Sequence, residues 1–263
     1  MKSNHEIDYT IYGEEMQFVE IELDPQEAAI AEPGAFLMME DGIDMQTLFG
    51  DGSQQQGGFF GKLLNAGKRV LVGENLFMTA FTNNSYGIKK VSFASPYPGK
   101  IIPFDLSIFN NKIICQKDAF LCAAKGVSIG IEFQKKLGVG LFGGEGFIME
   151  KLEGDGMSFL HACGHVIKRD LQMGERLKID TGCIVGFTSN VEYNIEFVGG
   201  IKNSIFGGEG LFFATLTGPG TVWIQTLPIS RLAGRILSYG TYKKREEGSV
   251  LGGIGNMLDG DGW

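Results

Sequence analysis

Short apolar runs separated by turn residues dominate the chain, and this pattern predicts strands. Residues 19–23 alternate apolar and polar side chains, as a half-buried strand does. Turn signals at Asp24-Pro25 and at Glu32-Pro33-Gly34 bound two apolar runs, Ala28–Ile30 and Phe36–Met39. We expect both runs to be short buried strands. Few segments carry a helical period, so the pattern predicts an all-β fold.

The same pattern recurs along the chain. Residues 142–156 and 206–220 are identical at eight of fifteen positions, and both begin with Phe-Gly-Gly-Glu-Gly. The offset of 64 also relates Ile131-Glu132-Phe133 to Ile195-Glu196-Phe197. A weaker copy surrounds the Gly-Glu pair at 73–74. A repeat of this kind predicts one β-unit present three times.

We therefore predict three β-sandwich or double-stranded β-helix-like units related by pseudo-threefold symmetry. The predicted organisation is a single three-repeat β domain over 1–240, with units at 8–94, 95–160 and 161–236, and a charged, Gly-rich C-terminal tail at 241–263.

Two glycine-rich triplets, Gly154-Asp155-Gly156 and Gly218-Pro219-Gly220, occupy matching positions in the second and third copies. Glycine reaches positive φ without strain and proline fixes its own φ, so we interpret both triplets as hairpin turns.

Composition and charge limit the classes of partner and the cellular location that we expect for the protein. The net charge is −8 and the isoelectric point about 5.0, while the longest basic cluster is Lys243-Lys244-Arg245. A nucleic-acid partner is not expected, because binding phosphates needs concentrated positive charge. The first six residues lack the apolar core of a signal peptide, and no apolar run is long enough to span a membrane. Four cysteines without metal-ligand spacing favour free, mostly buried thiols in a cytoplasmic protein.

Several motifs together resemble a known family. They are Ala31-Glu32-Pro33-Gly34-Ala35, Pro98-Gly99-Lys100-Ile101 and the two Phe-Gly-Gly-Glu-Gly segments at 142–146 and 206–210. The chain resembles bacterial members of the Altered Inheritance of Mitochondria family (protein twenty-four), from about Tyr9 to about Ile236. The resemblance implies an all-β fold like that of the tryptophan RNA-binding attenuation protein. It also implies relatives without established catalytic residues, of which the mitochondrial one is associated with the inner membrane.

His161-Ala162-Cys163-Gly164-His165 is the sharpest candidate for chemistry. On a strand, His161, Cys163 and His165 would point to one face, where imidazole and thiolate could bind Zn²⁺. The alternative is a packed β-face. The matching positions of the third copy favour it, because they are Gln225, Leu227 and Ile229.

Glu74, Glu145 and Glu209 recur in the three copies. Around a threefold axis their carboxylates could converge on a hard cation. The alternative is repeated turn chemistry, with each carboxylate accepting backbone N–H groups or lying in solvent.

A segment rich in glycine, lysine and bulky apolar residues precedes each Gly-Glu turn. Symmetry would bring these crossover segments to one end of the molecule, as a partner or membrane surface. The alternative is that they bury contacts between copies. The candidate residues are Phe59, Phe60, Leu63, Leu64, Leu137, Leu141, Phe142, Ile201, Ile205 and Phe206.

The sequence thus predicts a non-enzymatic scaffold or adaptor that forms homo-oligomers and touches a membrane surface from the cytoplasmic side, with no cofactor. Gly126-Val127-Ser128-Ile129-Gly130 has the letters of a nucleophile elbow, but a strand pattern follows it where the elbow needs a helix. The alternative function is a metal- or small-ligand-dependent enzyme or binding module of the double-stranded β-helix type.

Overall fold

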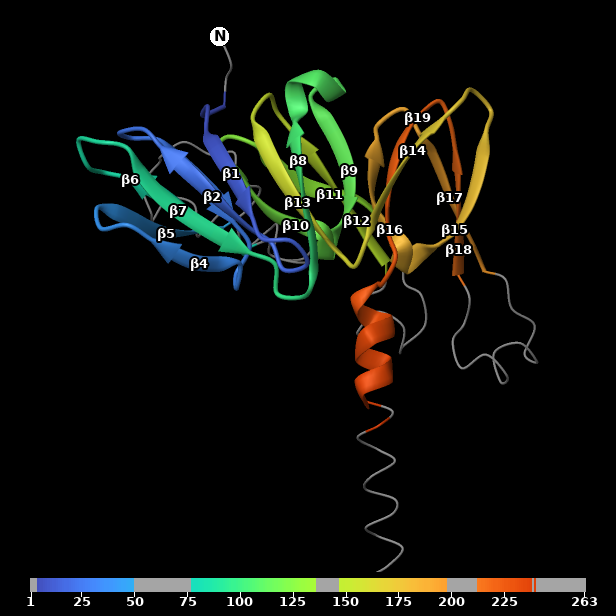
Figure 1. The fold of residues 1–263 in the computed structure, drawn as a ribbon. Helices are drawn as coiled ribbons and strands as arrows, with labels where there is room; N and C mark the ends of the chain where they lie inside the picture. The colour runs from blue at the N-terminus through green and yellow to red at the C-terminus, as the bar shows by residue number, and fades with distance from the viewer. Residues whose placement is uncertain (1–3, 50–76, 136–146, 198–211, 238, 240–263) are drawn as a thin grey trace, which may run out of the picture.

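A computed structural model describes residues 4–49, 77–135, 147–197, 212–237 and 239 (Figure 1). Its regular structure is almost entirely strand, which confirms the predicted all-β fold. The strands of the first third are β1 (Asp8–Tyr12), β2 (Phe18–Leu23), β3 (Ala28–Ala31), β4 (Phe36–Met39), β5 (Ile43–Phe49), β6 (Phe77–Asn83) and β7 (Lys89–Ala94).

The middle third contributes β8 (Gly99–Asp105), β9 (Lys112–Gln116), β10 (Phe120–Ala124), β11 (Ser128–Lys135), β12 (Phe147–Glu153) and β13 (Met157–Cys163). The last third contributes β14 (Val166–Leu171), β15 (Arg176–Asp180), β16 (Ile184–Thr188), β17 (Glu192–Phe197), β18 (Phe212–Thr217) and β19 (Gly220–Gln225). Short 3₁₀ turns connect some of them: η1 (Leu106–Phe109), η2 (Lys117–Ala119) and η3 (Thr181–Cys183).

These strands form four antiparallel sheets. Sheet I has the order β1-β2-β7-β4, sheet II β5-β6-β3-β10-β13-β8, sheet III β11-β12-β9-β16-β19-β14, and sheet IV β15-β18-β17. Sheets II and III each combine strands from two successive thirds of the chain. In Figure 1 the N-terminal third lies on one side of the molecule and the C-terminal third on the other.

Three apolar clusters fill the spaces between successive sheets. The first contains residues of sheets I and II, the second of sheets II and III, and the third of sheets III and IV. In β3 the side chains of Ala29 and Ala31 enter the first cluster, while that of Ile30 enters the second. Central strands are therefore buried on both faces, which explains why β3 and β10 read as continuous apolar runs.

One pattern of strand pairing occurs in each third. In the first, β2 and β4 pair with β7, and β3 and β5 pair with β6. The same four pairings hold for β8–β13 and for β14–β19. The rotational symmetry of the three groups stays a prediction.

Two local predictions are wrong. The triplets at 154–156 and 218–220 are not hairpin turns, because β12 pairs with β11 and β9 whereas β13 pairs with β10 and β8, and β18 and β19 lie in different sheets. The glycines there allow neighbouring parts of the chain to approach the backbone closely. A Cβ on Gly218 would collide with the carbonyl oxygen of Gln172 and with Leu171.

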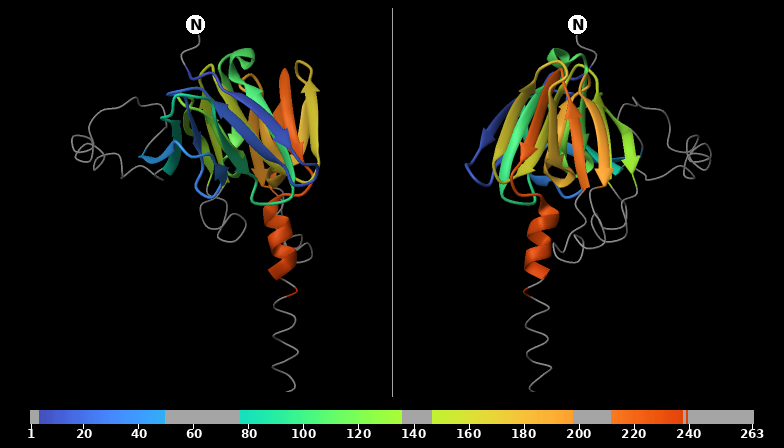
Figure 2. Two further views of the ribbon diagram at one scale, coloured as in Figure 1. Left: turned by 60° about the vertical axis from the view of Figure 1, so that its left-hand side comes forward. Right: turned by 90° about the vertical axis from the view of Figure 1, so that its right-hand side faces the viewer.

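A helix not predicted from the sequence spans residues 229–237. It begins after Pro228 and projects away from the sheets (Figures 1 and 2). Near its start, Arg231 Nη2 lies 2.7 Å from Asp180 Oδ2, so an ion pair ties the helix to the end of β15.

Candidate functional site

The predicted metal ligands His161, Cys163 and His165 do not lie on one strand face. His161 and Cys163 are buried in β13, but the strand ends at Cys163, Gly164 takes a φ of +79°, and His165 is exposed. Among the described residues, no three His, Cys, Asp or Glu side chains are grouped so that they could hold a metal ion.

His161 instead has the contacts of a structural histidine. Its Nδ1 lies 3.2 Å from the Ser95 hydroxyl, and its ring packs against Tyr97 with centroids 4.9 Å apart. Burial lowers the pKa of His161 to about 4, although a hydrogen bond to the backbone of Phe120 acts the other way. The ring is therefore neutral at physiological pH.

The other predicted candidates lie outside the described residues. These are the three recurrent glutamates Glu74, Glu145 and Glu209, together with the ten apolar residues of the crossover segments. The cation site and the membrane surface stay predictions. No helix in the described ranges is long and apolar enough to cross a membrane.

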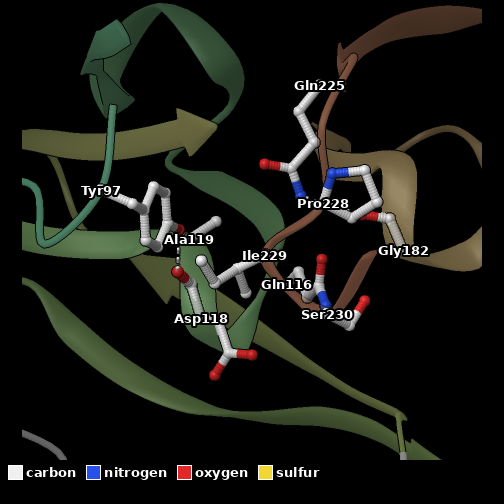
Figure 3. Close-up of a pocket in the computed structure, with 9 residues that line it drawn as sticks. All are labelled: Tyr97, Gln116, Asp118, Ala119, Gly182, Gln225, Pro228, Ile229 and Ser230. Atoms are coloured by element: carbon white, nitrogen blue, oxygen red, sulfur yellow. Dashed lines mark hydrogen bonds between the residues drawn. The ribbon is translucent and has the colours of Figure 1, made fainter. Parts of the chain in front are cut away.

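A small cavity lies between η2 and the segment that leads into the helix (Figure 3). Its volume is about 20 Å³, which accommodates a single water molecule and no small-molecule ligand. The Tyr97 hydroxyl donates to the Asp118 carbonyl oxygen at 3.2 Å along one wall. Gln225, on the opposite side, accepts from the Cys163 amide and donates to the Gly182 carbonyl. These hydrogen bonds hold the walls of the cavity together. The residues that line the cavity are Tyr97, Gln116, Asp118, Ala119, Gly182, Gln225, Pro228, Ile229 and Ser230.

A wider depression of about 400 Å³ follows the N-terminal segment. Residues 5–9 line it together with Met157. His5 is already engaged there, because its Nδ1 accepts the amide proton of Ala28 at 3.0 Å. The polar groups come from one segment and do not converge from several elements, as they do in ligand sites.

Glu32, in the turn after β3, is a carboxyl group with a strongly raised pKa. Burial, the largest cause, and the nearby carboxyls of Glu150 and Asp118 together raise its pKa to about 8, while Lys117 partly opposes them. Glu150, on β12, is only 1% exposed. Glu32 is therefore largely protonated at neutral pH, a state unsuited to holding a cation.

The clearest exposed feature is β4, at the edge of sheet I. Its four residues Phe36, Leu37, Met38 and Met39 are all apolar and are 37–48% exposed. Within the described ranges β4 pairs with β7 alone. Monomeric proteins normally protect such edges with charge, proline or a covering segment, because an open apolar edge invites pairing with another chain.

The strands at the matching place in the pairing pattern are covered. β10 and β16 correspond to β4, and each has a second neighbour, β3 and β9 respectively. All five residues of β10 are buried, as are the first four of β16. Among the described residues, β4 thus differs from these two strands in lacking a second neighbour, which is consistent with its exposure.

The strand β15 lies at one edge of sheet IV. Where β3 and β9 each have two neighbours, β15 pairs with β18 alone in the part of the chain that the structure describes. Its Ile179 is buried against the sheet, whereas Arg176 and Lys178 are exposed.

Fold and surface together define an all-β protein whose prominent described feature is the exposed apolar edge strand β4. The chain belongs to the family described as "Mitochondrial biogenesis AIM24", whose model matches residues 9–227.

A relative with a similar length is the uncharacterised protein M6_Spy0233 of Streptococcus pyogenes serotype M6. It is 30% identical over 230 residues, which cover 85% of this chain and 88% of the relative. The crystal structure of protein SPYM3_0169 from Streptococcus pyogenes is also similar. It has a TM-score of 0.69 and 25% identity, and the match covers 89% of this chain and 99% of that one.

Proposed function

We propose that this protein is a non-enzymatic, self-associating scaffold. The observation that carries the proposal is the β4 edge, in which four consecutive apolar side chains are exposed although those of β10 and β16 are buried. An exposed apolar strand edge is costly in an isolated molecule and is a template for another strand.

The pairing pattern supports the further proposal that the scaffold consists of three copies of one unit. Its four pairings occur in each third of the chain, and the middle and last thirds repeat at the offset of 64 found in the sequence. Such a modular arrangement lets one kind of contact be used repeatedly.

Light scattering coupled to size-exclusion chromatography tests self-association. We expect the wild-type protein to have a mass above that of the 28.6 kDa chain, and the mass to fall on dilution. A mass of one chain over the whole accessible concentration range would contradict the proposal.

The substitution Leu37→Lys tests the β4 edge itself. Leu37 is 47% exposed. Burying this exposed part of its side chain against another copy contributes about 1 kcal/mol to association, whereas burying the charge of a lysine there costs more than that. We expect association to weaken at least about tenfold. Ile88→Lys is the matched control, because Ile88 is 58% exposed in the turn before β7 and lies off the edge. Equal effects of the two variants would contradict a role for β4.

A further inference from the structure

We propose that copies of this chain join head to tail, with β4 of one copy pairing antiparallel with β15 of the next. This inference rests on the proposed self-association and names the two strands that form the contact.

The chain contains two examples of the contact already. β3 pairs with β10, and β9 pairs with β16, so that each junction joins one third of the chain to the next. The junctions place Ala31 opposite Cys122, and Cys115 opposite Gly186. Both turn two partial sheets into one continuous sheet of six strands.

β4 has the features of the strands that enter these junctions. Its ladder with β7 shifts register between Phe36 and Met38. The ladders of β10 and β16 shift between residues 120 and 122 and between 184 and 186, respectively. Met38 therefore corresponds to Cys122 and Gly186, each of which lies opposite the accepting strand.

β15 has the features of the strands that accept them. Cys115 pairs with Glu150 on one side, and Ile179 pairs with Ala214 in the same way, both at the repeat offset of 64. Ile179 therefore corresponds to Cys115. The inferred register is Met38 opposite Ile179 of the next copy, and Met39 opposite Lys178.

The charges of the two edges are complementary. Glu40 and Asp41 directly follow β4 and are exposed, while Arg176 and Lys178 are exposed on β15. In the inferred register Asp41 would lie opposite Arg176 of the next copy, and both side chains would point to the same face as Lys178. Opposite charges that face each other on neighbouring strands favour this register.

One chain cannot pair its own two edges as they lie, because β4 and β15 are on opposite sides of the molecule (Figure 1). A contact between two different surfaces is heterologous, so it generates a ring where the rotation closes and a filament where it does not. Sheet I of one copy and sheet IV of the next would form one sheet of seven strands, from the four and three strands that each contributes.

Disulfide cross-linking between two variants, each with one added cysteine, tests the strands and the register. Met39→Cys protein is mixed with Lys178→Cys protein under mild oxidation, since directly opposed strand residues have the Cα separation of a disulfide. Met39 and Lys178 are both exposed, so neither substitution removes core packing. The register control replaces Lys178→Cys with Arg176→Cys, two residues along the same face.

We expect a cross-linked dimer in the first mixture, forming at least about tenfold faster than with Arg176→Cys, and little with either variant alone, because a head-to-tail contact keeps identical positions apart. Wild-type protein controls for its own cysteines, of which Cys183 is partly exposed. Association without a preference for the Lys178→Cys partner would refute the β4–β15 contact and leave self-association standing. Wild-type protein that stays monomeric would refute both. A monomeric disulfide in a chain with both substitutions would refute the head-to-tail form.

Hydrogen exchange on the wild-type protein needs no variant. We expect the amides of residues 36–39 and 176–180 to become protected together as the concentration rises, while the β1 edge does not change. Association without this joint protection would overturn the inference.

Discussion

The raised pKa of Glu32 predicts an unusual dependence of stability on pH. In the unfolded chain this carboxyl group titrates near 4.5, whereas in the folded protein its pKa is about 8. The folded state therefore binds more protons between these values. The contribution of the neutral side chain is fully present below pH 4.5 and is lost as the pH rises through 8.

The substitution Glu32→Gln removes the charge and keeps the shape. At about 1.4 kcal/mol for each pH unit, the rise in pKa corresponds to an upper bound of about 5 kcal/mol. Glu32 keeps some contact with solvent, which screens the charge, so we expect about 2 kcal/mol.

Urea denaturation at several pH values, at one protein concentration, measures the effect. The free energy of unfolding of Glu32→Gln relative to wild type should rise by about 2 kcal/mol between pH 5 and pH 9. Glu192→Gln, at an exposed position of β17, should show no such trend. A difference between Glu32→Gln and wild type that stays constant across this range would refute the assignment of a buried, neutral carboxyl group.

Two further predictions concern packing, both measured as free energies of unfolding in urea. Asn83→Ala should cost about 2–4 kcal/mol, because the buried amide of Asn83 donates to the carbonyls of Leu23 and Gly87 at 2.8 Å each. The neighbouring Asn84→Ala, at an exposed position, should change stability by less than about 1 kcal/mol, and similar losses for the two variants would contradict this account. Gly99→Ala should cost more than about 3 kcal/mol, since its Cβ would collide with the backbone carbonyl of β13, whereas Gly87→Ala, with nothing within 4 Å, should be nearly neutral.

The sequence predicted strands well where one face of a strand is buried. Residues 19–23 alternate, and the structure has β2 there with its apolar residues buried. It predicted Ala28–Ile30 and Phe36–Met39 equally well as strands, but only β3 is buried and β4 is exposed. Both are continuous apolar runs, and whether such a strand is covered depends on which strands lie beside it. That information is not local to the run.

Two differences between the sequence analysis and the structure have local causes. The predicted metal ligands needed β13 to continue to His165, but Gly164 takes a positive φ and ends the strand. The helix at 229–237 was missed although apolar residues at 229, 232 and 236 have helical spacing after Pro228. This short helical pattern was outweighed by the strand pattern in the rest of the chain. The β4 and β15 edges could not be found from sequence, because an edge depends on which of the described strands lie beside it, and that is set by the whole fold.

The shared sheets also impose an order on folding during synthesis. One edge of β3 stays unpaired until β10, which begins at Phe120, has been synthesised. In the same way, one edge of β9 stays unpaired until β16, which begins at Ile184, has been synthesised. A ribosome adding about 5–20 residues per second leaves each edge uncovered for several seconds. A nascent chain halted between these strands would present the same kind of apolar edge that β4 keeps in the finished chain.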